Sequence, residues 1–226
     1  AKKPFAAALE KVDGPAKPDG SVGSAGEVSY YAVPATSNAS AKVVNDLLRN
    51  GYEVFRTTAT SKDGQRSLPA GTFLVKPASL AALAESCRKH GVSASVVGTA
   101  GGPKVFLKPP KVGIYRSYRG IADEGWLRYV LDEYGFPFTS VTNQRIRRGG
   151  LRTEFDTIFI PSQPASFISE GNRAGMYPEE YCGGLGIEGK DAIAVFIDKG
   201  GTAVFVGHAA NWAVVELGLD ATNVVA

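Results

Sequence analysis

The sequence predicts an α/β fold made of mainly parallel, doubly wound sheets, divided into two lobes. Short apolar segments typical of strands alternate with segments whose apolar residues recur at the helical period. A helix, a glycine and then a strand follow one another at 48–52, 89–92, 133–136 and 198–202. Such short turns from helix to strand are typical of parallel sheets that carry helices on both faces.

The first lobe is expected over residues 27–104. It follows a segment, 1–26, rich in Gly, Pro, Ser and Lys, which predicts an arm or linker and includes a short amphipathic piece at 5–9. Helices are expected after Asn38 and Ser79, and a polar loop at 58–69. Strands are expected at 28–33, 52–56, 71–75 and 93–97, with a short edge strand at 105–107.

The second lobe, 105–226, opens with a clear strand–loop–helix–strand unit at 111–141. The apolar residues of its helix are spaced i, i+3, i+4, i+7, at Leu127, Val130, Leu131 and Tyr134. Asp123 is expected to cap this helix at its N-terminus, and Gly135 to end it. Strands are then expected at 155–160 and 202–206, helices within 143–150, 188–199 and 211–217, and a long loop at 162–184.

Composition sets limits on the class of protein. The 226 residues are 44% hydrophobic and 21% charged, as in an ordinary globular protein, and no apolar run approaches the length of a membrane span. The formal net charge is only +3, so we expect no nucleic-acid partner. A small basic cluster, formed by Arg145, Arg147, Arg148 and Arg152, is interpreted as a solvated helix end.

The candidate pocket lies in the second lobe, where three loops leave the carboxyl ends of predicted strands. Their polar residues are Arg116, Arg119, Ser162, Gln163, Glu170, His208 and Asn211. The acidic pair Asp123 and Glu124 lies beside Trp126, which would offer an aromatic surface to a ligand. The alternative is that the loop residues are only solvated, and that the acidic pair only favours the start of a helix.

The residues predict neither a metal site nor a cofactor. Only two histidines occur, His90 and His208, on different lobes, whereas a catalytic zinc site takes three protein ligands. The G-x-G-x-x-G run at 184–189 does not follow a predicted strand, as a dinucleotide fingerprint would. For the same reason, Cys182 does not match a nucleophile elbow. Cys87 lies on the apolar face of a predicted helix and is expected to be a buried, unreactive thiol.

The second half resembles the class I glutamine amidotransferase-like fold, a flavodoxin-like arrangement of three layers. The resemblance rests on the helix, Gly-Gly-Thr and strand that lead from 188 to 211. It implies a catalytic cysteine near Gly207-His208-Ala209. No Cys, Ser or Thr stands there, although amide hydrolysis by this route needs a nucleophile.

More of the chain resembles the region that follows the catalytic domain in certain large bacterial zinc carboxypeptidase-family proteins. The shared motifs are VNDLLRNG at 44–51, PAGTF at 69–73, DEGW at 123–126, YGFP at 134–137, FD at 155–156 and GGLG at 183–186. The resemblance implies a non-catalytic accessory domain of an exported protein, whose partners are an upstream metallopeptidase domain of the same polypeptide and a peptide substrate. Two alternatives remain. One is a divergent amidotransferase-like hydrolase that uses Cys182 or His208, and the other is a peptide- or cell-wall-binding module that uses Arg116, Arg119, Glu124 and Trp126.

Overall fold

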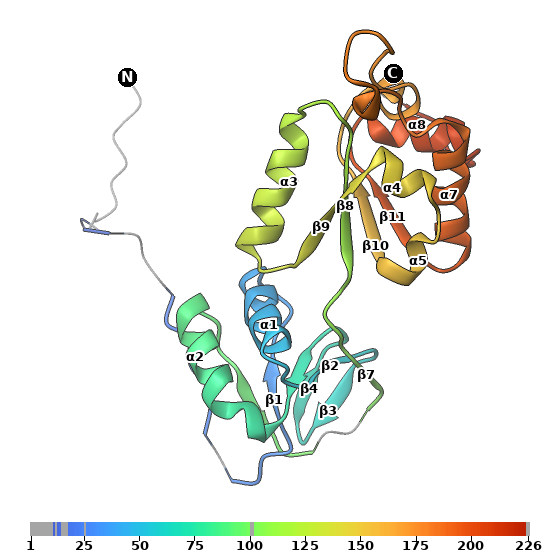
Figure 1. The fold of residues 1–226 in the computed structure, drawn as a ribbon. Helices are drawn as coiled ribbons and strands as arrows, with labels where there is room; N and C mark the ends of the chain where they lie inside the picture. The colour runs from blue at the N-terminus through green and yellow to red at the C-terminus, as the bar shows by residue number, and fades with distance from the viewer. Residues whose placement is uncertain (1–10, 12, 15–17, 25, 100–101, 225–226) are drawn as a thin grey trace, which may run out of the picture. The chain divides into compact units, whose positions relative to one another are not determined.

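The computed structural model describes residues 11, 13–14, 18–24, 26–99 and 102–224 as a mixed α/β protein. The chain forms two compact units, unit 1 at Ala1–Leu107 and unit 2 at Lys108–Ala226 (Figure 1). Within the described ranges, no helix combines the length and the apolar character that crossing a membrane requires. The amphipathic piece expected at 5–9 lies outside the described residues.

Unit 1 contains an antiparallel five-stranded sheet, so the parallel sheet expected for the first lobe was wrong. The strands lie in the order β6-β1-β5-β2-β7, and each neighbouring pair is antiparallel. In chain order the elements are β1 (Tyr30–Val33), α1 (Ala39–Arg49), β2 (Val54–Thr57), β3 (Ser61–Asp63), β4 (Arg66–Leu68), β5 (Phe73–Val75), the 3-10 turn η1 (Pro77–Ser79), α2 (Leu80–His90), β6 (Ser95–Val97) and β7 (Lys104–Phe106).

The expectation failed because of where β5 enters the sheet. Helix α1 does connect two strands that point the same way, since β1 and β2 are both antiparallel to β5. Strand β5 lies between them, which gives the split βαβ arrangement. The helix-to-strand pattern of the sequence is the same for adjacent and for split strands, so it could not distinguish the two topologies.

The loop expected at 58–69 is instead largely a β-hairpin of strands β3 and β4. Its turn follows Asp63, and Gly64 adopts a left-handed φ of +58°, which glycine tolerates best. Leu68 at the end of β4 is buried and packs with Leu74 and Val97 on the sheet face opposite the helices. The hairpin therefore covers part of that face.

Helices α1 and α2 cover the other face of the same sheet. Their apolar residues pack with those of β1, β2 and β5 in one core, which includes Leu47, Leu83 and the fully buried Cys87. Burial raises the pKa of the Cys87 thiol to about 11, as expected for an unreactive cysteine. Part of the expected arm is held in place: Gly23 donates its backbone N–H to Ala94 O at 2.9 Å.

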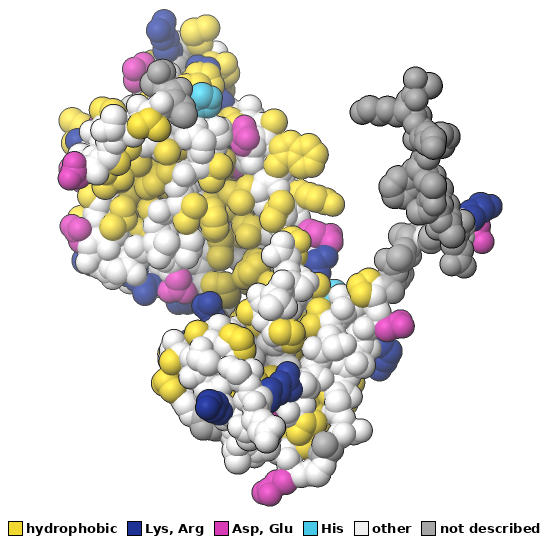
Figure 2. Space-filling view, turned by 180° about the vertical axis from the view of Figure 1, so that it is seen from behind, with side chains coloured by type: hydrophobic (Ala, Val, Ile, Leu, Met, Phe, Trp, Pro, Cys, Tyr) yellow, Lys and Arg dark blue, Asp and Glu magenta, His cyan; other side chains and the backbone are white. Residues whose placement is uncertain are grey.

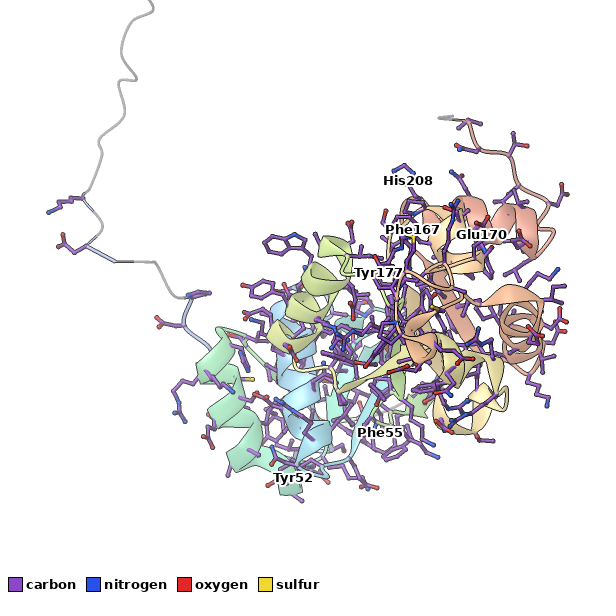
Figure 3. The ribbon with its side chains drawn as sticks, turned by 45° about the horizontal axis from the view of Figure 1, so that its top comes forward. Tyr52, Phe55, Phe167, Glu170, Tyr177 and His208 are labelled. Atoms are coloured by element: carbon purple, nitrogen blue, oxygen red, sulfur yellow. The ribbon has the colours of Figure 1, made fainter. Side chains whose placement is uncertain are left out.

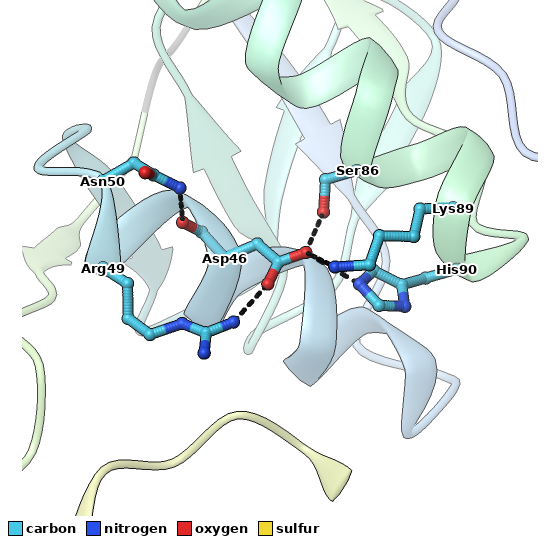
Figure 4. Close-up of polar contacts among 6 residues, drawn as sticks. All are labelled: Asp46, Arg49, Asn50, Ser86, Lys89 and His90. Atoms are coloured by element: carbon cyan, nitrogen blue, oxygen red, sulfur yellow. Dashed lines mark hydrogen bonds and ion pairs between the residues drawn. The ribbon is translucent and has the colours of Figure 1, made fainter. Parts of the chain in front are cut away.

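An acidic side chain joins the two helices of unit 1. The Asp46 carboxylate on α1 accepts hydrogen bonds from three α2 side chains: Ser86 at 3.1 Å, Lys89 at 3.3 Å and His90 at 2.8 Å (Figure 4). Arg49 donates to its other oxygen at 2.5 Å. Desolvation raises the pKa of Asp46, but the hydrogen bonds from His90, Arg49, Lys89 and Ser86 outweigh it and lower the value from 3.8 to about 2.

We expect the hydrogen bonds of Asp46 to make unit 1 less stable at acidic pH. Because the folded pKa of Asp46 is depressed, its contribution is present above pH 3.8 and is lost as the pH falls through about 2. Asp46→Asn should cost about 1 to 2 kcal/mol at neutral pH, after allowance for solvent screening. Amide hydrogen exchange of α1 and α2 would measure this, with the exposed Glu85→Gln as control. An unchanged exchange rate in Asp46→Asn would contradict the prediction.

Unit 2 contains the parallel sheet that the sequence predicts. Its four strands lie in the order β11-β10-β8-β9, and every neighbouring pair is parallel. In chain order the elements are β8 (Val112–Arg116), α3 (Ala122–Glu133), β9 (Phe138–Thr142), α4 (Asn143–Arg147), α5 (Leu151–Glu154), β10 (Thr157–Ile160), α6 (Ala165–Ser169), the 3-10 turn η2 (Glu179–Tyr181), α7 (Gly186–Asp198), β11 (Thr202–Phe205) and α8 (Ala209–Glu216).

Helices lie on both faces of this sheet (Figure 1). The larger core forms where α4, α5, α7 and α8 pack against Tyr115, Ile158 and Ile160. On the other face, Leu131 of α3 packs against Val112 and Ile114. Helix α3 begins at Ala122, so Asp123 lies in its first turn and is not the N-cap that the sequence predicted.

The α3 face of the sheet is only partly covered. Leu131 is the one buried residue of α3, whereas Trp126, Tyr129 and Val130 are exposed. Phe159 of β10 packs on this side and is only half-buried. In the view of Figure 2, hydrophobic side chains gather in the middle of unit 2 and charged side chains at its margin.

Candidate functional site

The candidate site lies at the carboxyl edge of the parallel sheet of unit 2. The chain passes from β8 to β9 on one side, then returns to build β10 and β11 on the other side of β8. The point between β8 and β10 is therefore a topological switch point, where ligands bind in open α/β sheets. The loops that follow β8 and β10 both lie at this edge, at the top of unit 2 in Figure 1.

A cavity of about 370 Å³ opens beside the loop that follows β8. Its lining brings together three of the residues that the sequence singled out, Arg116, Arg119 and Glu124. It adds Tyr181 from the long loop that precedes α7, whose ring lies edge-on to Tyr118 with the centroids 5.5 Å apart. Residues from β8, α3 and a distant loop therefore meet in one concave surface.

Arg119 also lines a second cavity, of about 360 Å³, formed by α6 and the loop that follows it. The other residues of its lining are Ser166, Phe167, Glu170, Gly171, Arg173, Met176 and Tyr177. Phe167, Glu170 and Tyr177 are labelled at the same end of unit 2 in Figure 3. Arg119 thus borders both cavities.

The two cavities carry an excess of positive charge. Among the described residues, no ion pair involves Arg116, Arg119 or Arg173. Glu124, by contrast, accepts from Arg128 Nη2 at 2.6 Å, so its charge is already neutralised. Arginine side chains that border a cavity without an acidic partner favour an anionic ligand.

Buried amide side chains hold the long loop in place. Asn143 is fully buried; its Oδ1 accepts from Tyr115 Oη at 2.5 Å and its Nδ2 donates to Gly183 O at 2.8 Å. Arg147 donates to Gly184 O at 2.8 Å. A Cβ on Gly184 would lie 2.4 Å from Ile168 O, so only glycine allows the loop to pass this close to α6.

A second group of predicted residues meets at the turn between β11 and α8. The backbone N–H of His208 donates to Ser162 Oγ at 3.2 Å, which brings together two of the predicted positions. Gly207 adopts a φ of +53°, and a Cβ there would lie 2.6 Å from Ser162 Oγ. The turn therefore has no room for a side chain at position 207.

The remaining predicted residues lie elsewhere. Gln163 is 2% exposed, and its Oε1 has no hydrogen-bond partner within the described part of the chain. Asp123, Trp126 and Asn211 are exposed, and none lines the cavities described above. The Cys182 Sγ lies 3.4 to 3.5 Å from the carbonyl oxygens of Arg173, Tyr177 and Pro178.

The described residues form neither a dinucleotide-binding motif nor a metal cluster. The G-x-G-x-x-G run follows the 3-10 turn η2 (Glu179–Tyr181) and not a strand. His90 is hydrogen-bonded to Asp46 in unit 1, and His208 belongs to unit 2. Over the ranges that the structure covers, no three His, Cys, Asp or Glu side chains are grouped as metal ligands would be.

Several residues of the site were not predicted. Phe167, Asn172, Arg173 and Tyr181 lie in a segment that was interpreted as one long loop, although it contains α6 and η2. Asn172 is only 3% exposed, and it directly follows Gly171 in the sequence. A polar residue next to a glycine was the only local signal for it, and that signal is common in loops.

No protein-family model, curated protein sequence or solved structure matches this chain significantly. Its fold and site define a mixed α/β protein with one antiparallel and one parallel sheet, and with an arginine-lined cavity at the carboxyl edge of the parallel sheet.

Proposed function

We propose that this chain is a non-catalytic accessory region of an exported zinc carboxypeptidase-family protein, and that its unit 2 is a class I glutamine amidotransferase-like lobe. In this role it packs against the upstream metallopeptidase domain or presents a peptide to it. The parallel strand order of unit 2 and its helices on both faces support the flavodoxin-like, three-layer assignment.

The observation that carries the proposal is the turn at Gly207. A strand, a tight turn and a helix follow one another at β11, Gly207 and α8, where the resemblance implies a nucleophile. The residue with the left-handed φ is glycine, and Ser162 Oγ fills the space a side chain would need. Without a nucleophile at this turn, the lobe retains a scaffold and a cavity but lacks the group that forms an acyl intermediate.

The size of the native gene product tests the accessory role. An antibody against this chain should recover, from the source cells, a protein much heavier than 23.8 kDa. Its peptides should include an upstream His-x-x-Glu segment, and it should bind zinc in a domain outside this chain. A native product with the mass of this chain alone would contradict the proposal.

The alternative enzyme is a divergent amidotransferase-like hydrolase that uses Cys182 or His208. Ser162 and His208 lie at the same turn, where the His208 backbone N–H donates to Ser162 Oγ at 3.2 Å. We expect the purified chain to show no turnover on amide and ester substrates. A turnover that Cys182→Ala or His208→Ala abolishes would replace the accessory role with this enzyme.

A further inference from the structure

The Arg119 side chain is held in one orientation by two different contacts. Its Nε donates to Asn172 Oδ1 at 3.0 Å, and its guanidinium lies over the Phe167 ring, 4.0 Å from the centroid. A long side chain normally loses conformational entropy when it binds a ligand. Here the loss has already occurred on folding, so Arg119 is preorganised for binding.

Asn172 is itself fixed in one orientation. It is 3% exposed, and its Nδ2 donates to Tyr181 O at 3.0 Å. Its backbone O accepts from Gly183 N at 2.8 Å. Exchanging the amide oxygen and nitrogen would place a donor against Arg119 and an acceptor against a carbonyl, so this network permits one orientation.

The two contacts of Arg119 leave its two terminal nitrogens unused. Nε is taken by Asn172 and one face of the guanidinium by Phe167, while no carboxylate in the described ranges pairs with this arginine. A guanidinium with both terminal nitrogens available matches a carboxylate or a phosphate in a bidentate arrangement.

The cavity on the Phe167 side favours a carboxylate that is joined to an apolar group. Phe167, Met176 and Tyr177 line it, and Met176 and Tyr177 are 74% and 48% exposed. Methionine and aromatic side chains are common on surfaces that adapt to apolar ligands. Glu170 lines the same cavity (Figure 3). It can accept from a peptide N–H. Its negative charge also offsets one of the two arginines of this cavity, Arg119 and Arg173, which favours a singly charged anion over a doubly charged phosphate.

We propose that Arg119 binds the terminal carboxylate of a peptide, with the side chain of the last peptide residue in the cavity lined by Phe167, Met176 and Tyr177. Asn172 is a positioning residue that acts through Arg119. The inference rests on the proposed accessory function and names the part of the peptide that is recognised.

The test compares two probes on the full chain, N-acetyl-glycyl-phenylalanine and its C-terminal amide, by NMR titration. The acid should bind at least about tenfold more tightly than the amide, because a charge-assisted bidentate pair is lost in the amide. Arg119→Lys keeps the positive charge but loses the planar pair of terminal N–H donors. It should therefore remove most of the preference for the acid over the amide. Asn172→Ala should reduce the preference less, while the amide binds as before.

Arg148→Ala is the matched control, because Arg148 is an exposed arginine of unit 2 that lines neither cavity. It should bind both probes as the unchanged chain does. Equal binding of acid and amide would overturn the carboxylate inference and leave the accessory role standing. Inorganic phosphate that displaces the acid at comparable concentration would also overturn it, in favour of a simple anion site. Binding of neither probe would overturn both the inference and peptide presentation.

Discussion

Trp212→Ala should destabilise unit 2 by about 3–5 kcal/mol, since it removes the largest fully buried side chain of the core. The indole is 1% exposed and packs against Phe205, with the ring centroids 5.8 Å apart. Its Nε1 donates to Ser169 Oγ at 2.8 Å. The substitution therefore leaves a cavity in the core, and it leaves the Ser169 hydroxyl without its hydrogen-bond donor. Both losses lower the free energy of unfolding.

The midpoint of urea unfolding, followed by far-UV circular dichroism, measures this loss. Trp126→Ala is the matched control, because Trp126 is the other tryptophan of the chain and is 68% exposed on α3. It should change the free energy of unfolding by no more than about 0.5 kcal/mol. Similar midpoints for the two variants would mean that Trp212 is not part of a tightly packed core.

Asn143→Ala should cost about 2–4 kcal/mol and should also loosen the long loop of the site. The variant loses two hydrogen bonds and leaves the buried Tyr115 hydroxyl without its acceptor. Burial raises the pKa of Tyr115, so this hydroxyl stays protonated and cannot escape the loss by ionising. Gly183 loses the donor that fixes the loop next to Asn172.

Hydrogen exchange across 171–184 separates these two effects. We expect faster exchange of the loop amides in Asn143→Ala and no change in Gln144→Ala, whose exposed side chain lies on the same helix. Tyr115→Phe combined with Asn143→Ala should cost less than the sum of the single substitutions, because the two residues share a hydrogen bond. Additive losses would argue against this coupling.

The sequence predicted the fold of unit 2 better than that of unit 1. Parallel strands that are buried on both faces leave uninterrupted apolar segments such as 112–115, and the apolar residues of α3 recur at the helical period. Gly135 ends α3 with a φ of +71°, as the sequence indicated. In unit 1, the order of strands depends on β5 lying between β1 and β2, and such long-range pairing has no local signal. The hairpin of β3 and β4 did have a local signal in the sequence, the Asp63-Gly64 pair.

The difference between local signals and long-range contacts also decides which residues of the site the sequence could predict. Arg116, Arg119 and Glu124 could be grouped because all three follow the carboxyl end of one strand in a single segment. Phe167 and Asn172 come from the other side of the switch point. Their position depends on close backbone contacts, such as Gly171 against Gly183, where a Cβ would lie 2.2 Å from a carbonyl oxygen. Contacts of this kind between distant segments leave no pattern of spacing.

The turn at Gly207 also sets a condition for engineering. Placing a thiol at this turn by Gly207→Cys alone would force a side chain into a left-handed backbone, 2.6 Å from Ser162 Oγ. The smallest design is therefore a double substitution, with Ser162→Gly making room for the thiol. Ser162→Gly would also remove the acceptor of the His208 backbone N–H, so the turn would lose this hydrogen bond.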